Sequence, residues 1–294
     1  MKELVSPRQV AQAIGASESS LKRWCDQGKI PTVYTAGGHR RIPVSGVLTF
    51  LRKAGMEIRS PEILGLPAAT TGGGERKLHE EQARLLQALV RGEESVCVEV
   101  TLNLYLANYP MSLICDEVLA KSFEQIGEKW GCGDVAVYQE RRSCELCHRV
   151  MHELRRSLPE LPVDAPVAVG GTIDGDPYTL ASAMAELVLR DLGFRAASLG
   201  NMLPFSSLAQ ALCETQPKLF WVSVSTIRDL DRFLEEFDRL STLAFDNQVT
   251  LVVGGKGLTD DVRKQMKYSA FCDNFQHLAA VAKQVVTNSS QAGE

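Results

Sequence analysis

The sequence predicts a mixed α and α/β protein built from three units in series: a small head, a four-helix bundle and a doubly wound parallel sheet. Three observations predict this. The 294 residues are about two domains' worth of chain. The basic residues gather at the start of the chain. Near residue 160 the pattern changes from long amphipathic helices to short apolar runs that alternate with helices.

Charge separates the head, residues 1–60, from the rest of the chain. The head carries ten Lys and Arg against four Asp and Glu, a net charge of +6. The remainder carries 22 basic and 32 acidic residues, a net charge of −10, so the whole chain averages to −4. A basic unit on an acidic body favours a nucleic-acid partner for the head. A solvated basic face without a partner is the alternative.

The head opens with two short helical patterns joined by a tight turn. Ser6 is placed to cap the first helix, which ends at Gly15, and Ser17 is placed to cap the second, which ends at Gly28. This arrangement predicts a helix-turn-helix. The outward side chains of the second helix are Ser19, Ser20, Lys22 and Arg23.

A short hairpin and a third helix complete the head. Residues 33–34 and 39–42 flank the turn at 36–38, which predicts a small β-hairpin, the wing, with cations near its tip. Residues 43–53 then form an amphipathic helix. The whole segment, with VAQAIGASESSLKRWCDQGKIP followed by AGGHRRIP, resembles the winged-helix domain of MerR-type regulators.

That resemblance implies double-stranded DNA as a partner. The second helix would enter the major groove, and the wing cations would contact phosphates and supply salt-dependent affinity. His39 has an alternative role as a packing or hydrogen-bonding residue of the wing. The candidate DNA contacts are Ser19, Ser20, Lys22, Arg23, His39, Arg40 and Arg41.

A linker and a bundle follow the head. Residues 61–76 include GLPAATTGGGE, which has little to bury and three consecutive glycines, and this predicts a flexible linker. Residues 77–160 then read as four helices with short connections, which predicts an antiparallel bundle. The four predicted helices are 78–91, 93–108, 110–130 and 135–157.

Residues 161–287 alternate strands with helices, which predicts a doubly wound parallel sheet of the flavodoxin-like kind. Ligands of such sheets bind at the carboxyl ends of the strands. The last residues, 288–294, are predicted to be disordered. The predicted strands are 167–169, 195–199, 219–224, 250–253 and 270–272; the predicted helices are 179–192, 206–214, 228–243, 259–267 and 275–286.

The loop at 171–181 resembles that of cobalamin-binding domains, which reads Asp, any residue, His, two residues, Gly. Asp176 matches the Asp of that pattern. Ser223 and Ser225 match a serine-containing strand end of the family, and Gly254 and Gly255 match its glycine pair. The ligand positions depart from the family, because its cobalt-binding His is Tyr178 here and the Gly of its loop is Ala181.

The bundle carries a second partial resemblance, to light-responsive cobalamin regulators of the same domain order. Those proteins have a Trp, a Glu ten positions later and then a His that reaches the metal. Trp130 and Glu140 match, but the His position is Arg141. Arg has no free lone pair and a neutral phenol is a poor donor to cobalt, so neither Arg141 nor Tyr178 replaces the missing histidines.

The last predicted bundle helix carries Cys144, Cys147, His148 and His152. The C-x-x-C-H spacing is that of covalent haem attachment, which needs export, and nothing here indicates export. A zinc or iron site is disfavoured because spacings of four and eight residues span about 12 Å of helix axis. Buried thiols with hydrogen-bonded or solvated histidines are the alternative, and His148 is the best substitute contact if this face meets a ligand.

These observations leave three readings of the body. It keeps the cobalamin-sensor architecture and acts through oligomerisation, it binds a corrinoid whose own base stays on the cobalt, or it holds another planar, tetrapyrrole-like ligand. The candidate ligand residues are Trp130, Glu140, Arg141, His148, Asp176, Tyr178, Ser223, Ser225, Gly254 and Gly255.

The predicted function is that of a sequence-specific transcriptional regulator, a repressor, which forms a dimer or tetramer. A corrinoid methyltransferase module is the competing class, but it depends on the His that is Tyr178 here and gains nothing from a winged-helix head. We expect no catalytic residues and no metal ligands. No apolar run is long enough to cross a membrane and no secretion segment is present, which predicts a cytoplasmic protein without a membrane partner.

Overall fold

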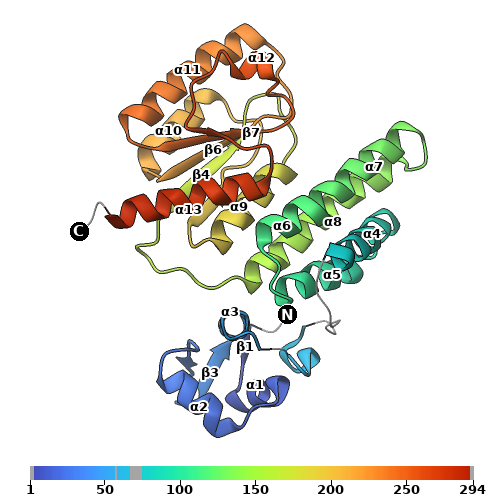
Figure 1. Ribbon diagram of the computed structural model, residues 1–294, viewed down its shortest axis with the longest axis vertical. Helices are drawn as coiled ribbons and strands as arrows, with labels where there is room; N and C mark the ends of the chain where they lie inside the picture. Colours follow the sequence, from blue (N-terminus) through green and yellow to red (C-terminus); the bar gives the residue numbers. More distant parts are fainter. Residues whose placement is uncertain (1–2, 57, 67–74, 292–294) are drawn as a thin grey trace. The chain divides into compact units, whose positions relative to one another are not determined.

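The computed structural model describes residues 3–56, 58–66 and 75–291 (Figure 1). The chain divides into two compact units, Met1–Glu160 and Leu161–Glu294. Within the described ranges, no helix is both long and apolar enough to span a bilayer. The first unit contains the head and the bundle, and the second is the α/β domain.

Both helices of the helix-turn-helix begin where their capping residues predict, and the first also ends as predicted, whereas the second ends at Asp26, two residues before Gly28. Helix α1 (Pro7–Ile14) has a capping box in which Ser6 accepts from the Gln9 backbone and Gln9 accepts from the Ser6 backbone. Gly15 ends it in the left-handed conformation. Helix α2 (Glu18–Asp26) is capped by the Ser17 hydroxyl, so both predicted N-caps are confirmed.

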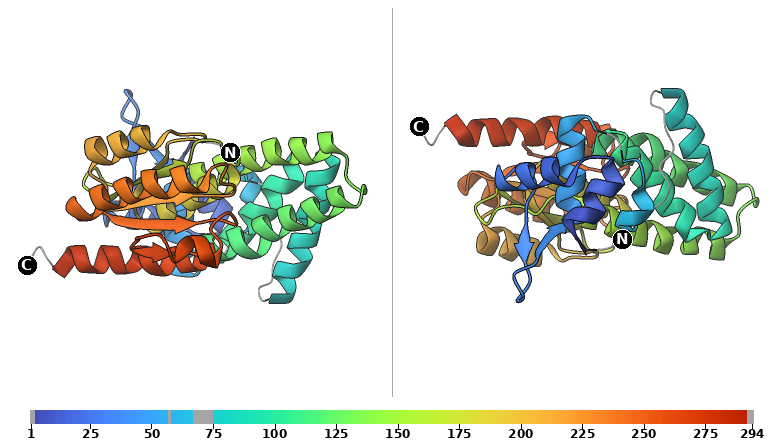
Figure 2. Two further views of the ribbon diagram at one scale, coloured as in Figure 1. Left: turned by 90° about the horizontal axis from the view of Figure 1, so that it is seen from above. Right: turned by 90° about the horizontal axis from the view of Figure 1, so that it is seen from below.

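The wing and the third helix of the head are also present. Strands β1 (Leu4–Val5), β2 (Val33–Tyr34) and β3 (Arg40–Pro43) form a small antiparallel sheet in the order β1-β3-β2. Figure 2 shows the β2–β3 hairpin projecting from the rest of the head. Helix α3 (Val44–Ala54) follows and closes the apolar core of the head.

The segment predicted as a linker begins with ordered structure. Pro61–Leu64 forms the 3-10 helix η1, which packs against α1 and buries Leu64 completely. Leu66 is buried as well. The prediction of a flexible linker from residue 61 is therefore wrong for 61–66, because Pro61–Leu64 packs on α1 and both leucines are buried. Residues 67–74, with the three glycines, lie outside the described residues.

The bundle consists of four helical rods, as predicted, and one of them is not a uniform α-helix. The third rod passes through six residues of π-helix, η2, between α6 and α7. The sequence predicts an unbroken helix there. A π-turn inserts one extra residue per turn and leaves no sequence signal that a 3.6-residue period would reveal. The elements are α4 (Glu75–Arg91), α5 (Glu94–Leu106), α6 (Met111–Ile114), η2 (Cys115–Ala120), α7 (Lys121–Gly131) and α8 (Val137–Ser157).

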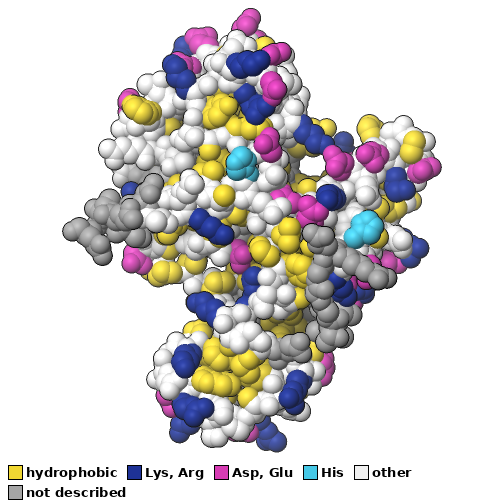
Figure 3. Space-filling view, in the orientation of Figure 1, with side chains coloured by type: hydrophobic (Ala, Val, Ile, Leu, Met, Phe, Trp, Pro, Cys, Tyr) yellow, Lys and Arg dark blue, Asp and Glu magenta, His cyan; other side chains and the backbone are white. Residues whose placement is uncertain are grey.

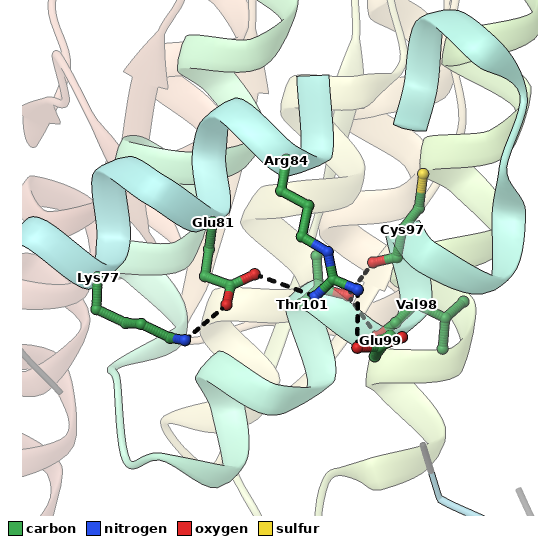
Figure 4. A network of polar contacts seen from close by, with 7 residues as sticks. All are labelled: Lys77, Glu81, Arg84, Cys97, Val98, Glu99 and Thr101. Carbon is green, nitrogen blue, oxygen red and sulfur yellow. Dashed lines mark hydrogen bonds and ion pairs between the residues drawn. The ribbon is translucent and has the colours of Figure 1, made fainter. Parts of the chain in front are cut away.

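A network of ionised side chains joins α4 to α5 (Figure 4). Glu81 is almost fully buried; one carboxylate oxygen lies 2.9 Å from Lys77 Nζ and the other lies 3.6 Å from Arg84 Nη1. Arg84 also donates to Glu99 of α5 at 2.8 Å, and this bond raises the pKa of its guanidinium. The partners of the buried Glu81 carboxylate thus come from its own helix, and the Arg84–Glu99 ion pair is the link of this network between α4 and α5.

The α/β domain is a five-stranded parallel sheet in the order β5-β4-β6-β7-β8. This is the flavodoxin-like order, so the predicted fold class is confirmed. The sequence of elements is β4 (Val167–Thr172), α9 (Leu180–Asp191), β5 (Arg195–Ser198), α10 (Phe205–Thr215), β6 (Leu219–Ser223), α11 (Leu230–Asp246), β7 (Thr250–Gly254), α12 (Asp260–Arg263), β8 (Ala270–Phe271) and α13 (Phe275–Gln291).

The two faces of the sheet bury different helices (Figure 1). One core contains apolar side chains of α10, α11 and α12, including Phe205, Phe233 and Phe237 with ring centroids 5.7–6.4 Å apart. The other contains side chains of α9 and α13. Several boundaries differ from prediction by a few residues, those of α12 and α13 among them. α12 has one turn, and α13 continues through 288–291, where disorder was predicted; 292–294 lie outside the described residues.

Gly255 provides a stability test for the carboxyl edge of the sheet. Its φ is +113°, and a Cβ placed there would lie 2.2 Å from the Val224 carbonyl oxygen. We expect Gly255→Ala to lower the free energy of unfolding by about 3 kcal/mol. The positive φ is strained for alanine, and the new Cβ would also clash with the Val224 carbonyl. Gly193→Ala is the matched control: φ is +94° but nothing lies within 4 Å, so about 1 kcal/mol is expected. If urea unfolding showed the same loss of free energy of unfolding for both variants, the clash at residue 255 would be contradicted.

Candidate nucleic-acid interface and ligand edge

The outward face of α2 carries two cations. Lys22 and Arg23 are exposed, while Leu21 on the opposite face is fully buried and Trp24 packs on Phe50 with ring centroids 5.0 Å apart. The packing of Leu21 and Trp24 therefore fixes the rotation of α2, and this rotation exposes Lys22 and Arg23 to solvent. On the face drawn in Figure 3, Lys and Arg side chains outnumber acidic ones over the head, at the lower end of the view.

The two serines proposed to read DNA are engaged at the start of α2. The Ser20 backbone N–H donates to the Ser17 hydroxyl at 3.1 Å. The Ser19 and Ser20 hydroxyl oxygens lie 2.9 and 3.0 Å from the Ser17 hydroxyl oxygen. Both hydroxyls thus contact the hydroxyl of Ser17, the N-cap residue of the helix. A cap of this kind satisfies backbone donors that the first turn leaves free.

The two wing arginines have different surroundings. Arg40 donates from Nη2 to Asp26 Oδ1 at 2.8 Å and to the Tyr34 hydroxyl at 2.9 Å, and from Nε to the same hydroxyl at 3.3 Å. These bonds, to Tyr34 first, raise the pKa of the guanidinium further above its ordinary value. Arg41 has no ion pair among the described residues, and His39 is exposed near the wing tip.

The partners of Arg40 are functional candidates that sequence reasoning missed. Tyr34 lies opposite Arg40 in the antiparallel register of the hairpin. That half of the arrangement has a local signal, because cross-strand neighbours follow once the turn is placed. Asp26 is the last residue of α2 and reaches Arg40 only through the tertiary fold.

In the α/β domain, the loop after β4 is organised around Asp176. Its side chain is completely buried. One carboxylate oxygen accepts from the Ser225 backbone N–H at 2.5 Å, and the other accepts from the Tyr178 backbone N–H at 3.1 Å. The Asp176 carbonyl accepts from the Thr172 hydroxyl at 2.7 Å. The carboxylate therefore braces its own loop and the end of β6.

The residues around this loop are placed as the pattern predicts, at the carboxyl edge of the sheet. Ser223 ends β6 and is buried, and Ser225 follows it as a backbone donor to Asp176. Gly254 ends β7 and Gly255 follows it, and their missing side chains let the backbone approach Cys272 and Val224. Close backbone packing accounts for the glycine pair without a ligand.

Tyr178 differs from the buried part of the loop because it is 57% exposed. Behind the edge, the Trp221 indole is buried between the sheet and α9, and its Nε1 donates to Ser182 at 2.9 Å. A Cβ on Gly170 would lie 2.4–2.5 Å from this indole. The space between β4, β6 and α9 is thus occupied by a side chain of the protein.

The bundle residues of the resemblance lie at the α7 end and the α8 start. Trp130 is 53% exposed. Glu140 accepts a weak bond from the Cys144 thiol at 3.5 Å, and its other oxygen pairs with Arg141 Nε at 3.3 Å. Arg141 itself is largely exposed. The Arg at the His position is therefore neutralised by the neighbouring Glu140.

The cysteine and histidine face of α8 is mainly a packing surface. Cys147 is fully buried, and burial raises the pKa of its thiol well above the ordinary range. Burial, with Glu140 beside it, raises the pKa of Cys144 to about 12. His148 is half-buried and burial lowers its pKa, whereas His152 is exposed. Among the described residues no three His, Cys, Asp or Glu side chains gather as a metal site.

The donor set does not fit a cobalt ion held by the protein. The two positions that would supply imidazoles carry a phenol, Tyr178, and a guanidinium, Arg141, which is ion-paired with Glu140. The buried carboxylate of Asp176 is satisfied by backbone N–H groups, so it is not free to orient a ligand side chain.

Comparisons with known proteins match two regions of the chain. Residues 4–55 match the family model of a helix-turn-helix domain, and residues 81–155 match that of a B12 binding domain. The chain is similar to the HTH-type transcriptional repressor CarH of Myxococcus xanthus, with 27% identity over 242 residues, 77% of this chain and 78% of that one. It is also similar to the trimethylamine corrinoid protein of Methanosarcina barkeri, with 20% identity over 61% of this chain and 84% of that one.

Among solved structures, the monomethylamine corrinoid protein of Methanosarcina barkeri shares the fold. The TM-score is 0.58 at 19% identity, and the match covers 72% of this chain and all of that one. A helix-turn-helix domain and a region with the fold of that corrinoid protein thus occur in one chain. We conclude that this chain carries a helix-turn-helix domain at residues 4–55 and a B12 binding domain at residues 81–155.

Proposed function

We propose that this chain is a sequence-specific transcriptional repressor of the MerR-type, winged-helix kind. The observation that carries the proposal is the head: a doubly capped helix-turn-helix whose second helix turns Lys22 and Arg23 outward beside a projecting wing. Cations on a recognition helix and on a neighbouring wing complement the phosphate charge of a DNA duplex. The candidate contacts remain Ser19, Ser20, Lys22, Arg23, His39, Arg40 and Arg41.

We place the boundary between head and bundle in the stretch after Leu66 and before Glu75. Within this proposal the body controls assembly. A dimer or tetramer presents two heads to a repeated operator, and the second head binds at high effective concentration. A signal that changed assembly would change repression without altering any DNA contact.

The similarity to CarH supports a B12-binding regulator as the second candidate. The match at 81–155 and the exposed Trp130 favour a flat corrinoid against the bundle. Since no imidazole occupies either ligand position, the cobalt would keep its own base or a solvent ligand. His148 is the candidate substitute contact on α8. Another tetrapyrrole-like ligand would use the same residues.

A corrinoid methyltransferase module is the competing class, because a trimethylamine corrinoid protein is among the relatives. The winged head and the absence of a His at position 178 both favour regulation over catalysis. We therefore propose a protein that binds DNA and is not an enzyme.

DNA selection tests the first proposal. The full-length protein is incubated with a random 30-base-pair duplex library, and bound duplexes are recovered and sequenced over successive rounds. We expect enrichment of one motif, repeated with the symmetry of the oligomer. A library that stays random, with retention at low salt only, would contradict sequence-specific binding.

A spectrum tests the second candidate. The protein is purified from cells supplied with cobalamin or with a haem precursor, and its absorbance is recorded from 300 to 700 nm. A band beyond about 320 nm that elutes with the protein supports a corrinoid or other tetrapyrrole. Absence of any such band, with no mass shift in native mass spectrometry, leaves the assembly role as the function of the body.

A further inference from the structure

Arg40 joins three elements of the head that are separate in sequence. It lies on β3, and its guanidinium contacts the Tyr34 hydroxyl on β2 and the carboxylate of Asp26 at the end of α2. The guanidinium carbon is 5.7 Å from the centroid of the Tyr34 ring. Two of its three nitrogens, Nε and Nη2, are committed to these partners.

The distal part of the wing needs a contact of this kind. Strand β1 pairs with Ile42 and Pro43 of β3, so the sheet of the head supports only the base of the hairpin. Beyond that base, the hairpin is closed by its own pairing and by the turn in which Thr35 and His39 hydrogen-bond. The Arg40–Asp26 ion pair links this segment to α2.

The thiol under the guanidinium supports the same geometry. Cys25, next to Asp26, is buried. Burial raises the pKa of its thiol, and Arg40 partly opposes this rise because its positive charge lies close by. Arg40 therefore lies over the last turn of α2, on the helix that carries Lys22 and Arg23.

We propose that Arg40 is a positioning residue that sets the angle between the wing and α2, while the adjacent Arg41 is the wing cation that contacts phosphate. The inference rests on the proposed DNA binding and divides it between two neighbouring arginines. Successive residues of a strand point to opposite faces, so Arg40 and Arg41 serve different surfaces. A preset wing angle reduces the ordering that binding would otherwise require.

Salt dependence separates these roles. Removing a residue that neutralises a phosphate makes the negative slope of log K, the association constant, against log salt shallower by about 1. Removing a positioning residue lowers the association constant and leaves the slope unchanged. Binding of full-length protein to the selected 30-base-pair duplex is measured by fluorescence anisotropy from 50 to 300 mM KCl. We expect Arg41→Ala to lower the slope by about 1. Arg40→Ala should lower K roughly fivefold with an unchanged slope.

The partner variants make the test independent of Arg40 itself. Asp26→Asn and Tyr34→Phe should both weaken binding at constant slope, and Asp26→Asn combined with Arg40→Ala should bind no worse than Arg40→Ala alone. Arg40→Lys should also bind DNA weakly, because a lysine ammonium lacks the planar guanidinium fork that contacts both Asp26 and Tyr34. These variants carry the test if Arg40→Ala does not fold, as judged by circular dichroism and thermal melting.

The opposite effects of these variants on DNA binding would overturn the proposal. If Arg40 contacted phosphate and Asp26 merely competed for it, Asp26→Asn would tighten binding, Arg40→Lys would restore it, and Arg40→Ala would lower the slope as Arg41→Ala does. Failure of the wild-type protein to select any duplex is a separate result. It would reject the proposed function itself, before either arginine is compared.

Discussion

Replacing Lys22 and Arg23 together with alanine is expected to lower the affinity of the full chain for its selected duplex by roughly a hundredfold at 150 mM salt. Each cation contributes a phosphate or base contact, and one good contact to a base edge is worth about 1–3 kcal/mol. Both side chains are exposed on α2, whereas Leu21 holds the helix from the other side. The free energy of unfolding should therefore change by less than about 0.5 kcal/mol.

The measurement is anisotropy of a labelled duplex, repeated over a salt series. Arg239→Ala with Lys264→Ala is the matched control, because it removes two exposed cations from the acidic α/β domain and the same net charge from the chain. The control should bind within about twofold of wild type. Equal losses for both double variants would show that net charge, rather than the face of α2, supplies the affinity.

Replacing Asp176 with alanine is expected to lower the free energy of unfolding of the α/β domain by about 3 kcal/mol. The variant leaves two backbone N–H groups, of Ser225 and Tyr178, without their acceptor at a buried site. A buried donor left unpaired costs about 1–3 kcal/mol, and bonds to a charged acceptor are the stronger ones. Asp176→Asn should be intermediate, because its amide keeps one acceptor oxygen.

Urea unfolding measures this effect in a background of Trp24→Phe and Trp130→Phe, so that Trp221 is the single indole. Trp221 is buried in the core of the α/β domain and reports on that domain alone. Asp174→Ala is the control, since Asp174 lies in the same loop but is exposed. A loss for Asp176→Ala no larger than for Asp174→Ala would show that the carboxylate does not hold the loop.

Local sequence chemistry predicted most of the element boundaries. Ser6 and Ser17 cap their helices because their hydroxyls satisfy free backbone donors, and Gly15 ends α1 because it adopts a positive φ. The alternation of apolar strands and helices from residue 161 predicted the parallel sheet, because a right-handed crossover is the one common way to connect such elements. Each cap depends on neighbouring residues, and each strand or helix on its own short pattern.

The candidate sites were predicted less completely. Lys22, Arg23 and Arg41 follow from position on a helix or strand, but the separate role proposed for Arg40 depends on Asp26, fourteen residues away. Asp176 matched a family loop, yet its acceptance of the Ser225 N–H 49 residues later has no sequence signal. The π-turn at Cys115–Ala120 has no sequence signal either, and the ion pair of Arg84 with Glu99 depends on the packing of α4 against α5.

The sequence by itself therefore determined the order of units, the caps, the parallel sheet and the absence of imidazole at positions 141 and 178, because each depends on residue type or short-range spacing. Only the tertiary structure decided which polar groups are already satisfied. It pairs Arg40 with Asp26, points the Asp176 carboxylate toward a backbone N–H group of its own loop and places the Trp221 indole beside α9. The physical reason is that a buried polar or aromatic group takes the partner that folding brings within reach, and sequence distance does not constrain that choice.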